Sequence, residues 1–125
     1  MALRFRDPLC YPCPYYWNGR WWREALGWVV VNDHPDEFEI RPATDRLPGI
    51  IFEPGAAHKL GKNRLHLDVR VGTGLVGEER LAALEAECAR LLPLGAVRVR
   101  LLTADDDNES CLVMQDVEGN EFCLD

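Results

Sequence analysis

Hydrophobic and polar residues alternate strictly along residues 62–71. This two-residue period predicts a strand with one side on a core and the other facing polar surroundings. The apolar side carries leucine and valine, and the polar side carries His66, Asp68 and Arg70. Residues 111–125 predict its partners, with a strand over 111–116, a turn at 118–120 and a closing strand over 121–125.

Two further segments have the spacing of amphipathic helices. Residues 15–26 carry a tryptophan-rich stripe that ends at Gly27, and residues 78–92 carry a leucine stripe with acidic residues in the first turn. Short apolar or alternating runs predict the remaining strands, and 32–36 and 45–49 read as turns. These strands are expected within 1–13 and over 28–31, 37–41, 49–53 and 96–102.

The predicted elements repeat, because each half of the chain reads strand–helix–strand–strand–strand. Leu26-Gly27 and Leu94-Gly95 mark the same helix-to-strand junction 68 residues apart. This repeat predicts an α+β fold of paired βαβββ modules, forming a curved mixed sheet around a cleft with helices on the convex side. We expect a single domain over 1–125, with module one at about 1–54, a linker at 55–63 and module two at 64–125.

Ionisable residues occupy the strand positions that should face this cleft. An alternative interpretation is a polar sheet face wetted by solvent. Trp21 packs in the core or stacks on an aromatic ligand. Besides Trp21, the predicted cleft residues are His66, Asp68, Arg70, Arg98, Arg100, Glu121 and Cys123 from the second half, with Glu39, Arg41 and Glu53 from the first.

Charge and cysteine content narrow the classes of function. The net charge of −7, from 21 acidic and 14 basic residues, argues against nucleic acid and anionic membrane surfaces as partners. The absence of a long apolar run or signal peptide and the odd count of five cysteines predict a soluble cytoplasmic protein with free thiols. Cys10 and Cys13 form a C-x-x-C pair open to structural, metal or redox roles, and the acidic run 105–109 is a solvated loop or a cation site.

Three motifs resemble those of the glyoxalase / bleomycin-resistance / extradiol-dioxygenase (vicinal oxygen chelate) superfamily. They are the aromatic–Leu–Gly–aromatic helix end at 21–28, and KNRLHLDV at 62–69 with DVEGNEFCL at 116–124, which resemble its glyoxalase-like subgroup. Together these matches cover about two-thirds of the chain. The resemblance implies the paired βαβββ fold and, in metal-using members, up to four ligands on the first and last strands of the modules.

The resemblance assigns only part of such a metal site. It implies that His66 and Glu53 are metal ligands, while Cys123 falls where a glutamate ligand is expected and Glu121 lies two residues away. An alternative interpretation of His66 is a cleft histidine that is hydrogen-bonded to Asp68, Glu53 or the backbone. On the first strand, Asp7 is the residue able to coordinate.

Three functions therefore stand as expectations. The first is cleft binding of a small molecule without a complete metal site, as in bleomycin-resistance-like proteins. The guest would be cationic or aromatic, or a carboxylate held by Arg70, Arg98 and Arg100. The second is a lyase, isomerase or dioxygenase that uses a divalent metal (Zn, Ni, Mn or Fe) on an oxygen-bearing substrate. The third is a non-catalytic interaction module, and the resemblance implies a homodimer.

Overall fold

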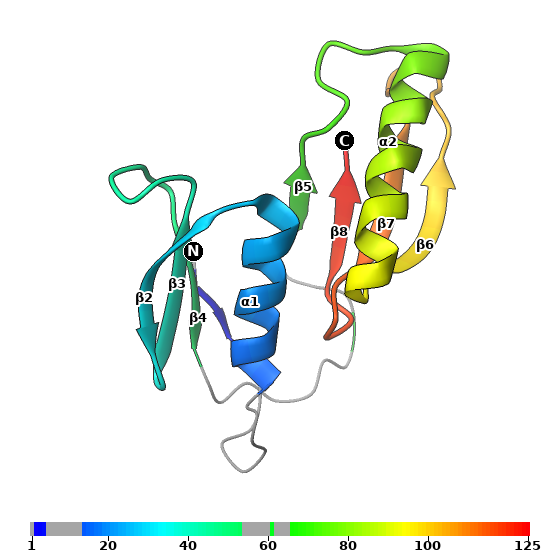
Figure 1. Cartoon of the computed structure of the whole chain (residues 1–125). Coiled ribbons are helices and arrows are strands. Elements are labelled where there is room, and N and C mark those ends of the chain that lie inside the picture. Colours follow the sequence, from blue (N-terminus) through cyan, green and yellow to red (C-terminus); the bar gives the residue numbers. More distant parts are fainter. Residues whose placement is uncertain (1, 5–13, 54–60, 62–65) are drawn as a thin grey trace. The chain divides into compact units, whose positions relative to one another are not determined.

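The computed structural model describes residues 2–4, 14–53, 61 and 66–125. The chain divides into two compact units, Met1–His58 and Lys59–Asp125, and each contains one helix and one four-stranded sheet (Figure 1). The predicted α+β class, built from two βαβββ units, is confirmed. Neither helix in the described ranges combines the length and apolar character needed to cross a bilayer.

The first unit contains β1 (Ala2–Arg4), α1 (Pro14–Leu26), β2 (Val29–His34), β3 (Glu37–Arg41) and β4 (Ile50–Glu53). Its sheet has the order β1-β4-β3-β2, in which β1 and β4 run parallel and the other neighbours run antiparallel. Helix α1 packs against β3 and β4. The helix covers this face because Trp21, Trp22 and Ala25 are buried on one side of it.

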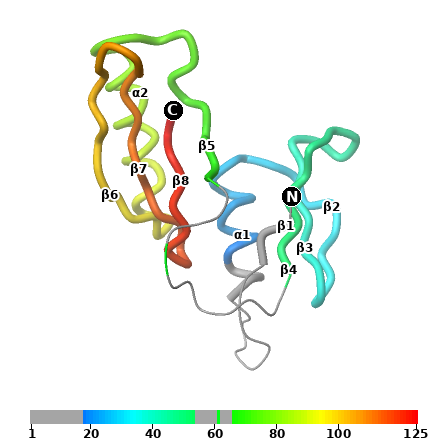
Figure 2. Tube along the Cα trace, turned by 180° about the vertical axis from the view of Figure 1, so that it is seen from behind, coloured from blue at the N-terminus to red at the C-terminus, as the bar shows by residue number. Residues whose placement is uncertain are grey.

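The second unit repeats this arrangement. It contains β5 (Leu67–Val69), α2 (Gly77–Leu91), a 3-10 turn (Leu92–Leu94), β6 (Val97–Leu102), β7 (Cys111–Gln115) and β8 (Glu121–Leu124). The sheet order is β5-β8-β7-β6, with β5 and β8 parallel. Figure 2 shows the face of this sheet that points away from α2, with the helix behind the strands. We call this side the distal face.

Alternation along the strands places the core of each unit on the helix side of its sheet. Phe38, Ile40 and Phe52 are fully buried in the first unit. In the second unit, the equivalent side chains of the last two strands are buried in the same way: Leu112, Met114, Phe122 and Leu124. From α2, Leu84, Cys88 and Leu91 complete this core.

Both outer strands contain a register shift at the same place in the repeat. It lies between Val30 and Asn32 in β2 and between Arg98 and Arg100 in β6, 68 residues later. The predicted turn at 32–36 is therefore partly wrong, because β2 continues to His34 and only two residues turn the chain into β3. The extra residue in each bulge changes which face the following side chains occupy.

The bulge in β6 also overturns the prediction that Arg98 and Arg100 share a face. Arg98 is paired with the buried Met114, and its guanidinium binds Glu85 of α2. Arg100 is paired with Val113, whose side chain lies on the opposite face. Strict alternation fails here because the bulge inserts one residue between the two arginines.

The predicted long strand at 62–71 is shorter in the structure. Only Leu67–Val69 forms β5, and residues 62–65 lie outside the described residues. The chain leaves the ladder after β5 at Gly72, against which the Arg80 side chain packs. A side chain at position 72 would overlap that guanidinium, which explains a glycine at this point.

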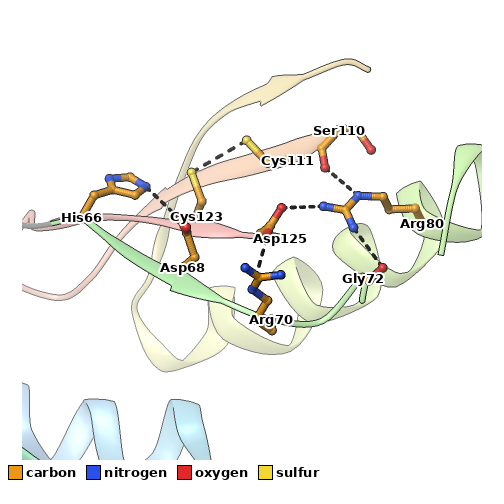
Figure 3. A network of polar contacts seen from close by, with 9 residues as sticks. All are labelled: His66, Asp68, Arg70, Gly72, Arg80, Ser110, Cys111, Cys123 and Asp125. Carbon is orange, nitrogen blue, oxygen red and sulfur yellow. Dashed lines mark hydrogen bonds and ion pairs between the residues drawn. The ribbon is translucent and has the colours of Figure 1, made fainter. Parts of the chain in front are cut away.

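Arg80 is the buried charged residue at the start of α2. Its Nε donates to the Ser110 carbonyl (2.8 Å), Nη1 to the Gly72 carbonyl (2.9 Å) and Nη2 to Asp125 (2.6 Å). The loops after β5 and before β7 and the residue after β8 are therefore joined by one guanidinium, as Figure 3 shows. Its planar fork supplies donors in several fixed directions, which a lysine lacks.

Gly19 in α1 provides a first test of the packing. A Cβ atom at this position would overlap Cδ1 of the fully buried Phe38 ring. We expect Gly19→Ala to lower the free energy of unfolding by about 1–2 kcal/mol, because overpacking outweighs the gain of about 1 kcal/mol in helix propensity. Chemical denaturation measures this loss, and Arg23→Ala, at an exposed position of the same helix, should change stability much less. A more stable Gly19→Ala protein would contradict this packing.

Arg80 provides the second test. Arg80→Ala should lower the free energy of unfolding by about 3 kcal/mol, since it leaves two carbonyls and the Asp125 carboxylate without their buried donor. The matched control is Arg90→Ala, which removes an exposed pair with Glu87 on the same helix and should cost about 0.5 kcal/mol or less. If the two variants lose the same free energy of unfolding, the buried network contributes no more to stability than an exposed ion pair.

Candidate functional site

The strand register of the second unit brings four residues from distant parts of the chain into one row. Asp68 of β5 is the partner of Cys123 in β8, and Cys123 is the partner of Val113 in β7. Arg100 of β6 continues the row next to Val113. Cross-strand partners share a face, so these side chains lie on the distal face.

His66, Asp68 and Cys123 form a cluster with three different donor atoms. One imidazole nitrogen, one carboxylate oxygen and the Cys123 sulfur all lie within 4.8 Å of one another. His66 Nε2 is 3.5 Å from Asp68 Oδ1, and both side chains are about half exposed (Figure 3). Cys123 is buried beneath them. Nitrogen, oxygen and sulfur at this spacing are a donor set suited to a divalent metal.

A second thiol lies beside this cluster. The sulfur atoms of Cys111 and Cys123 are 3.8 Å apart (Figure 3). Burial, the neighbouring Cys111 and the Asp68 and Asp125 carboxylates raise the pKa of the Cys123 thiol to about 12. Without a cation nearby, Cys123 is therefore a protonated thiol at neutral pH.

The thiols and Asp68 line a hollow of about 570 Å³. Its wall also includes Asp105, Glu109 and Asp125, together with Thr103, Asn108 and the strand end at Leu101 and Leu102. Asp105 is held by its own loop, because the backbone amides of Asp107 and Asn108 donate to its carboxylate and lower its pKa. The acidic run predicted as a loop or a cation site is thus one wall of a negatively charged hollow.

Two of the three arginines predicted to hold a carboxylate ligand pair with carboxylates of the chain itself. Arg98 reaches Glu85 on the helix side of the sheet, and Arg70 Nε is 3.5 Å from Asp125 Oδ2. Arg100 stays on the distal face. The charge balance around the hollow therefore favours a cationic ligand over an anionic one.

The remaining predicted residues lie in other places. Glu53 ends β4 in the first unit, where Arg41 also donates to Glu39 (2.6 Å). Trp21 is buried and packs edge-to-face on Trp22 at 5.0 Å, as a core role requires. Contacts of Glu53 and Trp21 with a ligand stay predictions. Asp7, Cys10 and Cys13 lie outside the described residues.

Sequence reasoning named His66 as a metal ligand and Cys123 as a cleft residue, and the structure brings these two side chains close together. Asp68 was predicted to line the cleft and was not named as a metal ligand, although it follows His66 by two residues and shares its side of the chain. Cys111 was read only as a strand residue. Its proximity to Cys123 depends on the register of β7 against β8, which the sequence did not reveal.

The raised pKa of Cys123 gives a pH dependence that can be measured. The folded protein holds the thiol proton more tightly than the unfolded chain, whose cysteines have the ordinary pKa of 9.0. This contribution to stability is complete below about pH 9 and is lost as the pH rises toward 12. We expect the stability advantage of the parent over Cys123→Ser, measured by denaturation with a chelator present, to fall across this range. If the unfolding free energies of the parent and of Cys123→Ser change in parallel with pH, the raised pKa of Cys123 is contradicted.

Comparisons with known proteins agree with this fold. An enzyme of the glyoxalase/bleomycin resistance protein/dioxygenase family from Burkholderia phytofirmans PsJN has a TM-score of 0.70, with 13% identity over 99% of this chain and 93% of that one. A mutant of the fosfomycin resistance protein FosX from Listeria monocytogenes, complexed with Mn(II) and 1S,2S-dihydroxypropylphosphonic acid, has a TM-score of 0.66, with 10% identity over 98% and 83%.

Lactoylglutathione lyase from Agrobacterium tumefaciens has a TM-score of 0.58, with 10% identity over 99% of this chain and 90% of that one. At these identities the likeness concerns the fold alone. No curated protein matches the sequence. A family model described as a glyoxalase-like domain matches residues 17–124. The chain therefore belongs to the glyoxalase-like domain family, within the vicinal oxygen chelate superfamily.

Proposed function

We propose that this chain is a metal-dependent glyoxalase-like protein whose second module holds a divalent metal through His66, Asp68 and Cys123. The observation that carries the proposal is the convergence of one nitrogen, one oxygen and one sulfur donor within 4.8 Å. Asp68 and Cys123 come from the first and last strands of the module, where the resemblance places metal ligands, and His66 directly precedes the first strand. The metal would bind a small oxygen-bearing molecule that enters from the adjoining hollow.

The donor set fits a borderline-soft divalent ion. Three protein ligands leave at least one position for water or substrate, as catalytic zinc sites do. Thiolate and imidazole together favour zinc over magnesium or calcium, which prefer oxygen ligands. The high pKa of Cys123 describes the thiol without metal. A bound cation reverses the local electrostatics, and metal binding then releases the thiol proton to solvent.

A bound divalent metal supplies Lewis acidity, polarising an oxygen atom of the ligand. The chain's own residues orient and select that ligand. Asp105 and Glu109 line the hollow and attract a positively charged group into it. The acidic wall argues against a phosphonate such as the one in the FosX complex, so we propose a shared metal dependence and a different substrate.

The hollow itself supports a second candidate function, which is metal-free binding of a cationic small molecule. Its wall contains four carboxylates, and Asp125 is the one that pairs with arginines, Arg70 and Arg80, within the described part of the chain. This candidate needs the hollow but does not need His66. The expected homodimer is compatible with either function and stays a prediction.

Metal content tests the first candidate directly. Protein purified without a tag or chelator should contain about one Zn, Ni, Mn, Fe or Co per chain, and His66→Ala should lower this content at least tenfold. The matched control is His34→Ala, because His34 is an exposed histidine of the β2–β3 hairpin and should leave the metal content unchanged.

The two candidates predict different results in this experiment. If the protein takes up none of these ions even when each is supplied in excess, the metal site is contradicted. Binding of organic ammonium compounds, measured by calorimetry in the presence of a chelator, would then support the metal-free candidate. If both histidine variants keep the metal, the ion lies elsewhere and the site assigned to His66 is wrong.

A further inference from the structure

We infer that Cys111 is a second sulfur ligand, so that Cys111 and Cys123 bind a thiophilic ion such as Zn(II) or Cd(II) between them. This inference rests on the proposed function in that it shares Cys123 with the metal site. It goes further by adding a ligand from β7, a strand that is neither the first nor the last of its module. It also names the class of metal.

The spacing of the two sulfur atoms matches the span of a tetrahedral metal site. Two thiolates that each lie about 2.3 Å from zinc, separated by a tetrahedral angle, are about 3.8 Å apart. The observed separation of Cys111 and Cys123 is 3.8 Å. Closing a disulfide would instead require a sulfur–sulfur distance of about 2.05 Å, and these residues are offset diagonally across the β7–β8 ladder.

The surroundings of the pair allow an ion to reach it. Both thiols line the hollow, and Cys111 is only partly buried. The carboxylates of Asp68 and Asp125 line the same space and attract a cation. Asp68 stands next to Cys123 in the parallel ladder, and its carboxylate oxygen lies within 4.8 Å of the Cys123 sulfur.

The chemistry of the pair predicts selectivity for soft metals. Binding converts two thiols and a divalent cation into a neutral dithiolate unit and releases two protons to the buffer, with no change in oxidation state. Two sulfur ligands favour Zn(II), Cd(II) and Co(II) over Mn(II) and Mg(II), which prefer oxygen. A site with one sulfur ligand, formed by Cys123 with His66 and Asp68, would discriminate less between these soft and hard ions.

The intensity of thiolate-to-metal charge-transfer absorption bands reports how many sulfur ligands bind the metal. The test uses a parent chain carrying C10S and C13S, because those thiols would contribute bands of their own. Loaded with one equivalent of Cd(II) or Co(II), this parent should show the intensity of two thiolates. Cys111→Ser and Cys123→Ser should each lower the intensity to about half or less, since each removes one sulfur. Cys88→Ala is the matched control, because it removes a buried thiol of α2 away from the pair, and it should leave the intensity unchanged.

X-ray absorption of the zinc-loaded parent gives a second measurement that needs no cysteine-ligand variant. Two sulfur neighbours at about 2.3 Å support the inference. One sulfur neighbour, or full charge-transfer intensity in Cys111→Ser, overturns it while leaving the three-ligand site of the proposed function intact. Failure of the proposed function has a different signature, because the metal would then be retained in His66→Ala.

Discussion

The parallel pairing of β5 with β8 is the constraint on which the site in the second unit depends. It places Asp68 directly beside Cys123, although 55 residues separate them in the chain. The ladder continues beyond the strands, where the Asp125 carbonyl accepts from the amides of Val71 and Gly72. Because Arg80 anchors Asp125 from α2, the helix, the two parallel strands and the wall of the hollow are held by one continuous set of bonds.

The sequence predicted most of the fold because its periodic signals are local. The alternation in residues 37–41 and the leucine stripe of α2 each depend on neighbours a few positions away, and both were correctly assigned. The register of β7 against β8, the bulge in β6 and the burial of Arg80 depend on contacts between distant segments. For that reason the face of Arg98 was wrong and the proximity of Cys111 to Cys123 was missed.

Replacing a carboxylate by a thiol changes what a metal site of this family can prefer. The resemblance expects a glutamate where Cys123 stands, which would suit hard ions as well as zinc. In the site proposed here, one sulfur ligand would narrow the choice of metal, and the second sulfur of Cys111 would narrow it further. The acidic wall of the hollow favours positively charged molecules over anionic ones.

The matched bulges in β2 and β6 also bear on how this protein avoids aggregation. These strands end the sheet order of their units, and exposed valines lie on both of them: Val29, Val30, Val97 and Val99. A straight, apolar outer strand is a template on which another chain can extend the sheet. The bulge interrupts the regular spacing of amides and carbonyls after two residues, so a foreign strand would lose its hydrogen-bond register at once. The bulge at the same place in each unit therefore makes both outer strands poorer templates for fibril-like growth.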